Sequence, residues 1–130
     1  MRYLTLAQVL LIHSLIIDET GGPHGVRDQG ALSSAVALPQ QVVFGRELYP
    51  TEFEKAAVYA RSIIMNHPFV DGNKRTGMAA ASVFLESNGY EVVAQEGEIE
   101  SEALVIVREK CSIESIAAWF KKHARKFTGR

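Results

Sequence analysis

The sequence predicts an all-α fold in a single domain that spans residues 1–130. Apolar residues recur at helical spacing along most of the chain, and glycine or proline separates one such stretch from the next. With 130 residues, of which 47% are hydrophobic, the chain is long enough to bury one core. We therefore expect one globular domain, with at most a short extended segment or hairpin beside its helices.

The first predicted helix begins after Thr5, a favourable N-cap residue, and ends before Gly21. A helix that is apolar on nearly all sides is usually buried, so we expect this helix at the centre of the fold. We interpret His13, which lies on its main apolar stripe, as a hydrogen-bonded core histidine rather than a ligand. The apolar residues of this helix are Leu6, Val9, Leu10, Leu11, Ile12, Leu15, Ile16 and Ile17.

An irregular loop and a short helix follow the first helix. Residues 21–28 contain three glycines and one proline, which predicts a loop without regular structure. Asp28 is then expected to cap a helix that continues to Leu38 and is stopped by Pro39.

The third and fourth predicted helices are the two with the clearest start and end signals. Thr51 and Glu54 form a capping box, so the third helix starts there and stops near residue 67, because Pro68 disfavours helical geometry in the residue before it. The fourth helix is expected over residues 73–88, ending at an Asn-Gly pair. It carries small residues that let a neighbouring helix approach closely, namely Gly77, Ala80 and Ala81.

The C-terminal third is expected to add a short extended segment and two amphipathic helices. Residues 90–93 fit a short strand or extended connection. Residues 98–110 and 112–125 each place apolar side chains along one helical face.

Charge and cysteine content exclude several classes of protein. The net charge is −1, which gives no strong overall attraction to nucleic acid, and we interpret the basic residues between Lys121 and Arg130 as a solvated helix end. The lone Cys111 forms no internal disulfide, which fits a reducing cytoplasm. The longest apolar stretch, residues 4–17, is too short to cross a bilayer. We expect a soluble cytoplasmic protein that does not bind membranes or, directly, nucleic acid.

The connection between the third and fourth helices breaks a local rule. Lys74 and Arg75 stand in the first turn of the fourth helix, where the helix dipole disfavours each cation by about 0.3–1 kcal/mol. A phosphate bound by the N–H groups of that turn would remove this penalty, and Gly72 allows it to approach closely. A tight connection also brings His67 close to Arg75. The sequence therefore predicts a phosphate site here.

The neighbouring residues supply the groups that phosphate chemistry needs. Histidine is the side chain that most often acts as a general base, so His67 is a candidate to take a proton from an attacking hydroxyl. Asp71 is a candidate magnesium ligand, since Mg²⁺ commonly binds one or two carboxylates together with substrate phosphates. Asn73 is expected to cap the helix or to orient a phosphate oxygen. Taken singly, each of these residues also fits a turn, a cap or a solvated charge, but together they favour one site.

The same residues resemble a known motif. The segment from His67 to Arg75 resembles the Fic motif, specifically its death-on-curing variant, in which a lysine follows the asparagine. Lys74 stands where AMP-transferring Fic proteins have glycine, and Met78 stands where they have a second arginine. Further similarity extends over most of the chain, at Gly21-Gly22, Gly25-Val26-Arg27-Asp28, Ser34-Ala35, Pro39 and Leu48-Tyr49-Pro50.

This resemblance implies a compact bundle of about six helices with the motif at its centre. It implies that His67 is the general base and Asp71 the Mg²⁺ ligand. Gly72 and Asn73 would form part of an anion cradle, while the side chains of Lys74 and Arg75 would contact the phosphates of ATP. Phe69 would point into the core. The resemblance also implies that residues 21–28, including Gly25, Arg27 and Asp28, lie near the site and help to position the target protein.

The resemblance further implies a toxin of a toxin–antitoxin pair. In this branch the γ-phosphate of MgATP would be transferred to a hydroxyl of a translation factor, with elongation factor Tu the implied target, and translation would be inhibited. A cognate Phd-like antitoxin would fold into a groove of the toxin. Two alternatives remain open: a Fic-type AMP transferase acting on a protein hydroxyl, and a non-catalytic module that only binds a partner.

Overall fold

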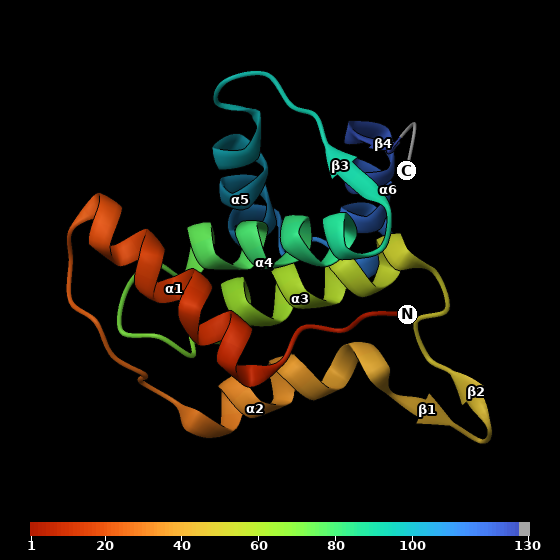
Figure 1. Ribbon diagram of the computed structural model, residues 1–130, viewed down its shortest axis with the longest axis horizontal. Helices are drawn as coiled ribbons and strands as arrows, with labels where there is room; N and C mark the ends of the chain where they lie inside the picture. The colour runs from red at the N-terminus through yellow and green to blue at the C-terminus, as the bar shows by residue number, and fades with distance from the viewer. Residues whose placement is uncertain (128–130) are drawn as a thin grey trace.

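A computed structural model describes residues 1–127 and shows a compact helical fold (Figure 1). The all-α prediction is confirmed, because six α-helices dominate this part of the chain and the strands are only two or three residues long. The helices are α1 (Leu6–Thr20), α2 (Gln29–Ala37), α3 (Glu52–Asn66), α4 (Asn73–Ser87), α5 (Glu98–Glu109) and α6 (Ile113–His123). A 3₁₀ helix (Leu38–Gln40) follows α2, and the strands are β1 (Val42–Val43), β2 (Arg46–Glu47), β3 (Tyr90–Val92) and β4 (Ala124–Lys126).

The antiparallel pair α3 and α4 forms the centre of the molecule (Figure 1). The predicted close approach at Gly77 is confirmed, since a Cβ there would lie 2.7 Å from Cγ1 of Ile64 and 2.9 Å from the carbonyl oxygen of Ala60. Only a glycine lets the two helix backbones come this near. Residues 67–72, which we call the motif connection, join these two central helices. The ends of this connection are therefore fixed by the best-packed part of the core.

The expectation that α1 occupies the centre is wrong. Only Val9, His13 and Ile17 of this helix are buried, whereas the side chains of Leu11 and Leu15 on its outer side are each 58% exposed. The central position belongs to α3, in which nearly every residue from Lys55 to Ile64 is buried. The physical reason is the size of the side chains on the two helices. Alanines at several α3 positions let neighbours approach from all sides, while the bulky leucines of α1 cannot all be covered by the two helices beside it.

Side-chain caps start the helices where the sequence predicts them. The hydroxyl oxygens of Thr5 and Thr51 accept hydrogen bonds from backbone N–H groups three residues later, and a carboxylate oxygen of Asp28 does the same for the N–H of Ala31. Each satisfies one of the N–H groups that a helix start leaves unpaired. The predicted starts of α1, α2 and α3 are therefore confirmed.

Two antiparallel strand pairs complete the fold. β3 pairs with β4, Tyr90 opposite Lys126, which confirms the predicted extended segment but ends α6 at His123 instead of Arg125, because the next residues pair with β3. β1 and β2 form a hairpin in a part of the chain for which no strand was predicted; it lies at the opposite end of α3 from the motif connection (Figure 1).

No helix within residues 1–127 is long and apolar enough to cross a membrane. Of the basic residues near the C-terminus, Arg130 lies outside the described residues. That residues 1–130 form one domain stays a prediction.

Candidate active site

The connection between α3 and α4 turns back tightly and brings its charged side chains to one cavity. His67 ends α3 in the left-handed conformation (φ 49°), and Gly72 precedes α4 with φ 80°. The expected proximity of His67 and Arg75 is confirmed, because both line one cavity of about 320 Å³. The lining residues are Ile17, Thr20, His67, Val70, Asp71, Gly72, Asn73, Lys74 and Arg75.

Asn73 holds the connection from inside. Its Oδ1 accepts a hydrogen bond from the N–H of Phe69, its Nδ2 donates to the carbonyl oxygen of Phe69, both at 3.0 Å, and the residue is only 7% exposed. The expectation that its side chain caps α4 is wrong, since Gly72 occupies the cap position and no side chain bonds there. The amide group is committed to the loop, so the backbone N–H of the helix start is what Asn73 offers an anion.

Phe69 and His13 form the floor of the connection. Phe69 is buried, as predicted, and its ring stacks on His13 with centroids 3.8 Å apart and an angle of 5° between the planes. The Nε2 atom of His13 lies 2.8 Å from the carbonyl oxygen of Asp71. A carbonyl only accepts, so Nε2 carries the proton and donates. This confirms His13 as a hydrogen-bonded core histidine and shows that its partner is the motif itself.

Residues 21–28 run along the outside of the connection, which confirms that this segment lies near the site. The N–H of Val70 donates to the carbonyl oxygen of Gly25 (3.0 Å), and the backbone N–H groups of Arg27 and Asp28 donate to the carbonyl oxygen of Pro68 (2.7 and 3.0 Å). These contacts fix the backbone on both sides of Phe69.

The guanidinium of Arg27 closes the end of α3. Its Nε donates to the carbonyl oxygen of His67 (2.7 Å) and its Nη2 to that of Asn66 (2.9 Å). Cations at a helix C-terminus satisfy its unpaired carbonyls and complement its dipole. The side chain of Asp28 caps α2. Arg27 and Asp28 thus hold the loop and its neighbour in place, and their role in positioning a target stays a prediction.

The cavity is electropositive at the start of α4. The side chains of Lys74 and Arg75 are exposed and have neither an ion-pair nor a hydrogen-bond partner among residues 1–127. The first turn of α4 also contains no acidic residue. Two unpaired cations beside the positive end of a helix dipole form a site whose natural ligand is an anion such as a phosphate. The side chain of His67 is likewise exposed at the rim of this cavity.

Asp71 is the one carboxylate that lines the cavity. Its Oδ1 accepts a hydrogen bond from the N–H of Gly72 (2.9 Å), and its Oδ2 faces Gly22, where an added Cβ would lie 2.7 Å away. No cluster of three metal-ligating side chains occurs within residues 1–127. The residues present therefore fit Mg²⁺ only as an ion held by one carboxylate together with substrate phosphates, which is a coordination that Mg²⁺ commonly adopts.

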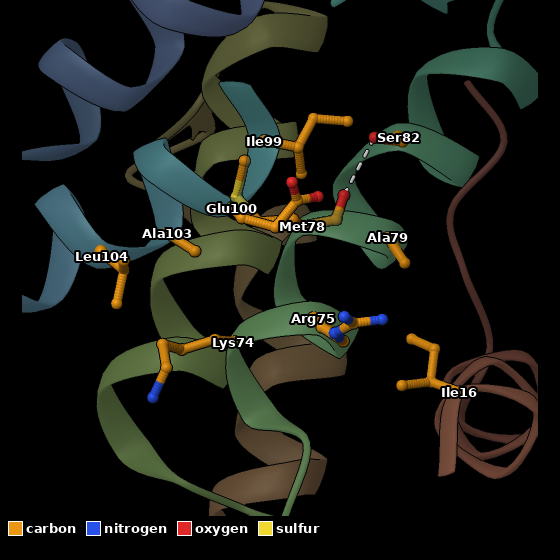
Figure 2. A pocket seen from close by; sticks show the side chains of 10 residues that line it. All are labelled: Ile16, Lys74, Arg75, Met78, Ala79, Ser82, Ile99, Glu100, Ala103 and Leu104. Carbon is orange, nitrogen blue, oxygen red and sulfur yellow. Dashed lines mark hydrogen bonds between the residues drawn. The ribbon is translucent and has the colours of Figure 1, made fainter. Parts of the chain in front are cut away.

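A second, larger cavity of about 520 Å³ lies between α1, α4 and α5 and shares Lys74 and Arg75 with the first (Figure 2). In Figure 2 the side chain of Arg75 extends toward Ile16 of α1, while Lys74 extends away from it. The resemblance implied a groove on the toxin, but its position was not predicted, because its walls come from three helices whose apolar faces look ordinary in the sequence. Its mostly apolar lining consists of Ile16, Met78, Ala79, Ser82, Ile99, Glu100, Ala103 and Leu104, with the two shared cations.

The sequence of this chain matches one family of proteins over the part that contains the site. The model of the Fic/DOC family matches residues 3–85, a span that includes the whole motif connection. The chain belongs to the Fic/DOC family. Within it, the chain falls in the Doc branch: it is 42% identical to the toxin Doc of Mycolicibacterium smegmatis over 119 residues, covering 90% of this chain and 89% of that protein. It is also 32% identical to the protein kinase doc of Escherichia phage P1 over 92 residues, covering 71% and 72% of the two chains.

Proposed function

We propose that this protein is the toxin of a toxin–antitoxin pair and that it transfers the γ-phosphate of MgATP to a hydroxyl of a translation factor, with elongation factor Tu the expected target. The observation that carries the proposal is one cavity at a helix start, lined by the exposed side chains of His67, Lys74 and Arg75, in which the two cations have no partner among residues 1–127. A phosphoryl transferase needs a site that binds the phosphates and a base beside it that accepts the hydroxyl proton. Its catalysis rests mainly on positioning and charge stabilisation.

The proposed reaction is a single displacement. The oxygen of the target hydroxyl forms a bond to the γ-phosphorus, and the bond from that phosphorus to the bridging oxygen of ATP breaks, so that ADP leaves. The hydroxyl proton passes to the neutral imidazole of His67. Lys74 and Arg75 would stabilise the phosphate charges, together with the N–H groups of the first turn of α4.

Asp71 would hold the magnesium ion through its carboxylate. When bound, Mg²⁺ would neutralise part of the charge of the ATP phosphates. The Asp71 side chain is exposed and lies in the same cavity as Lys74 and Arg75, so one carboxylate here reaches the place where the phosphates of ATP would bind.

Two residues favour phosphoryl transfer over AMP transfer. Lys74 narrows the cradle and adds a compact point charge at a position where AMP-transferring Fic proteins have glycine. Met78 is buried and lines the larger cavity, at a position where those proteins have a second arginine. AMP transfer would place the α-phosphate in the cradle, and it is the alternative that the labelling experiment below separates.

The larger cavity is the site that we propose for the expected antitoxin partner. A Phd-like segment that folds into an amphipathic helix would bury its apolar side between α1, α4 and α5. Acidic side chains on such a helix would meet Lys74 and Arg75, which both cavities share. Binding there would therefore also cover the phosphate site.

The decisive experiment incubates the protein with magnesium, elongation factor Tu and ATP labelled in parallel on the γ- or the α-phosphate. We expect transfer of the γ-label alone, and loss of transfer in His67→Ala. The control is His123→Gln, which changes a histidine outside both cavities and should retain transfer. Transfer of the α-label would make the protein an AMP transferase. Absence of both labels, together with no nucleotide binding by calorimetry, would leave only a partner-binding module.

A further inference from the structure

His13 makes three contacts with the motif connection although it comes from another helix. It is only 4% exposed, its ring stacks on Phe69, and its Nε2 donates to the carbonyl oxygen of Asp71. Its ring edge also borders Gly72, where an added Cβ would lie 3.7 Å from Cδ2 and Nε2. Burial of a polar side chain costs free energy unless the side chain is hydrogen-bonded. The bond to the Asp71 carbonyl therefore keeps the His13 ring in its buried position.

The peptide bond between Asp71 and Gly72 carries this contact to the site. The peptide is planar and trans, so its C=O and N–H groups point in opposite directions. The carbonyl points inward to His13, and the N–H of Gly72 therefore points outward, where it donates to Oδ1 of Asp71. One hydrogen bond fixes the rotation of the peptide, and the other fixes the carboxylate.

We infer that His13 is a positioning residue that sets the carboxylate of Asp71 through the Asp71–Gly72 peptide. This inference rests on the proposed function, in which that carboxylate holds magnesium. The second carboxylate oxygen, Oδ2, faces Gly22, so the side chain is bounded on that side as well. Outer groups that orient a metal ligand act through the ligand without touching the metal.

The chemistry of histidine explains why this residue type occupies the position. Its flat ring stacks on Phe69, and its Nε2–H donates to the carbonyl of Asp71 at the same time. A phenylalanine here would keep the stacking and lose the donor. A glutamine would keep an N–H donor and lose the ring. The two substitutions therefore separate the packing role from the hydrogen bond.

The test compares His13→Phe and His13→Gln with the wild type, and with Val9→Ala as a matched control. Val9 is fully buried on the same helix and its apolar side chain cannot hydrogen-bond to Asp71, so it reports a general loosening of α1. The first readout is the amide NMR signal and hydrogen exchange of Gly72 in the nucleotide-free protein. The second is the Mg²⁺ concentration that gives half-maximal transfer, with the melting temperature measured in parallel.

We expect His13→Phe to shift the Gly72 amide signal, to speed its exchange and to raise the required Mg²⁺ concentration about 10-fold, the size typical for loss of an outer partner of a metal ligand. His13→Gln should restore a large part of both, and Val9→Ala should change neither. An unchanged Gly72 amide signal in a folded His13→Phe variant would overturn the inference. If that variant does not fold, the inference would be overturned by a folded His13→Gln variant whose Gly72 amide signal is shifted as far as expected when the Asp71 carbonyl has no hydrogen bond. Lack of transfer by the wild type would instead defeat the proposed function, while the Gly72 readout would still judge His13.

Discussion

The two connections at the ends of α3 share one backbone feature and differ in how it is held. The β1–β2 hairpin precedes α3 and the motif connection follows it, about 22 Å away along a helix of this length (Figure 1). Each contains a bulky residue with positive φ: Phe44 at 50° in the hairpin turn and His67 at 49° in the motif. Such a conformation costs a residue with a Cβ about 1–2 kcal/mol.

The difference lies in the number of long-range contacts. Arg27 binds the carbonyl of His67 and His13 binds that of Asp71, so distant parts of the chain impose the shape of the motif, and Asn73 adds two local hydrogen bonds to Phe69. The hairpin has one strand pair with two residue pairs, its Glu47 binds Lys55 of α3, and the Phe44 side chain in its turn is fully exposed. Strain that several independent contacts maintain is typical of a functional site, whereas strain within a two-residue turn only needs the turn.

The largest expected effect comes from removing the two hydrogen bonds between the Asn73 side chain and the Phe69 backbone. Asn73→Ala leaves the buried N–H and carbonyl of Phe69 without partners, which should lower the free energy of unfolding by about 2–4 kcal/mol. Transfer activity should also be lost, because the loop then no longer presents His67 and Asp71 together. Urea unfolding and the labelling assay at a temperature where the variant is folded measure the two effects.

Asn88→Ala is the matched control for this prediction. The Asn88 side chain bonds the backbone N–H and carbonyl of Arg2 in the same way, at 2.9 Å each, and its Nδ2 also donates to the carbonyl of Phe84 (2.8 Å), but Asn88 is only half-buried and Arg2 is exposed. Water replaces these bonds, so the cost should stay near 1 kcal/mol and activity should remain. Equal losses in both variants would show that the motif connection is no more constrained than the chain terminus.

A second prediction uses two adjacent glycines. Gly21 and Gly22 both have positive φ, so replacing either with alanine should destabilise the protein by a similar amount, about 1–3 kcal/mol. An added Cβ meets nothing within 4 Å at Gly21, whereas at Gly22 it meets Oδ2 of Asp71 at 2.7 Å. Only Gly22→Ala should therefore reduce transfer and raise the Mg²⁺ requirement. A comparable loss of transfer in Gly21→Ala would mean that loop strain, and not the contact with Asp71, limits activity.

How much of this architecture follows from the sequence depends on the distance over which each interaction acts. The caps at Thr5, Asp28 and Thr51 were predicted correctly because each satisfies an N–H only three residues away. The central position of α1 was predicted wrongly because periodicity shows which side chains are apolar but not how many neighbours are present to cover them. The hairpin was missed because strands of two residues give no periodic signal.

The same argument applies to the site. Lys74 and Arg75 were identified because cations in a first helical turn conflict with the local dipole, a conflict visible within a few residues. The resemblance placed Arg27 near the site, but the hydrogen bonds by which His13 and Arg27 shape the loop were not predicted, because they span 58 and 40 residues of sequence. The glycines of residues 21–28 were the only local sign that this segment approaches the motif closely.

A third prediction tests whether the hairpin is independent of the site. The ammonium of Lys55 is fully buried and donates to Oε1 of Glu47 (3.0 Å) and to the carbonyl of Tyr49. Glu47→Ala leaves that buried charge with one fewer partner. Because Glu47 is half exposed, we expect a moderate loss of about 1.5 kcal/mol in the free energy of unfolding. Transfer activity should stay at the wild-type level.

Lys55→Met sharpens this test. It removes the buried charge together with its desolvation cost, and the Glu47 carboxylate returns to water, so the loss should be smaller than in Glu47→Ala. Urea unfolding of both variants measures the order. A loss of transfer in either variant, at a temperature where it is folded, would show that the hairpin communicates with the motif along α3.

The smallest expected effect is a gain of stability at the hairpin turn. Phe44 and Gly45 both have positive φ in a two-residue turn, the type I′ geometry that prefers Asn-Gly. Phe44→Asn should therefore raise the free energy of unfolding by about 0.5 kcal/mol without changing transfer. Phe44→Ala removes the same ring but keeps the backbone penalty, so it should give no gain. His67→Asn relieves the same penalty at the motif yet should abolish transfer, because there the left-handed residue is also the proposed base. Phe44→Asn with reduced transfer would remove the distinction between the two connections.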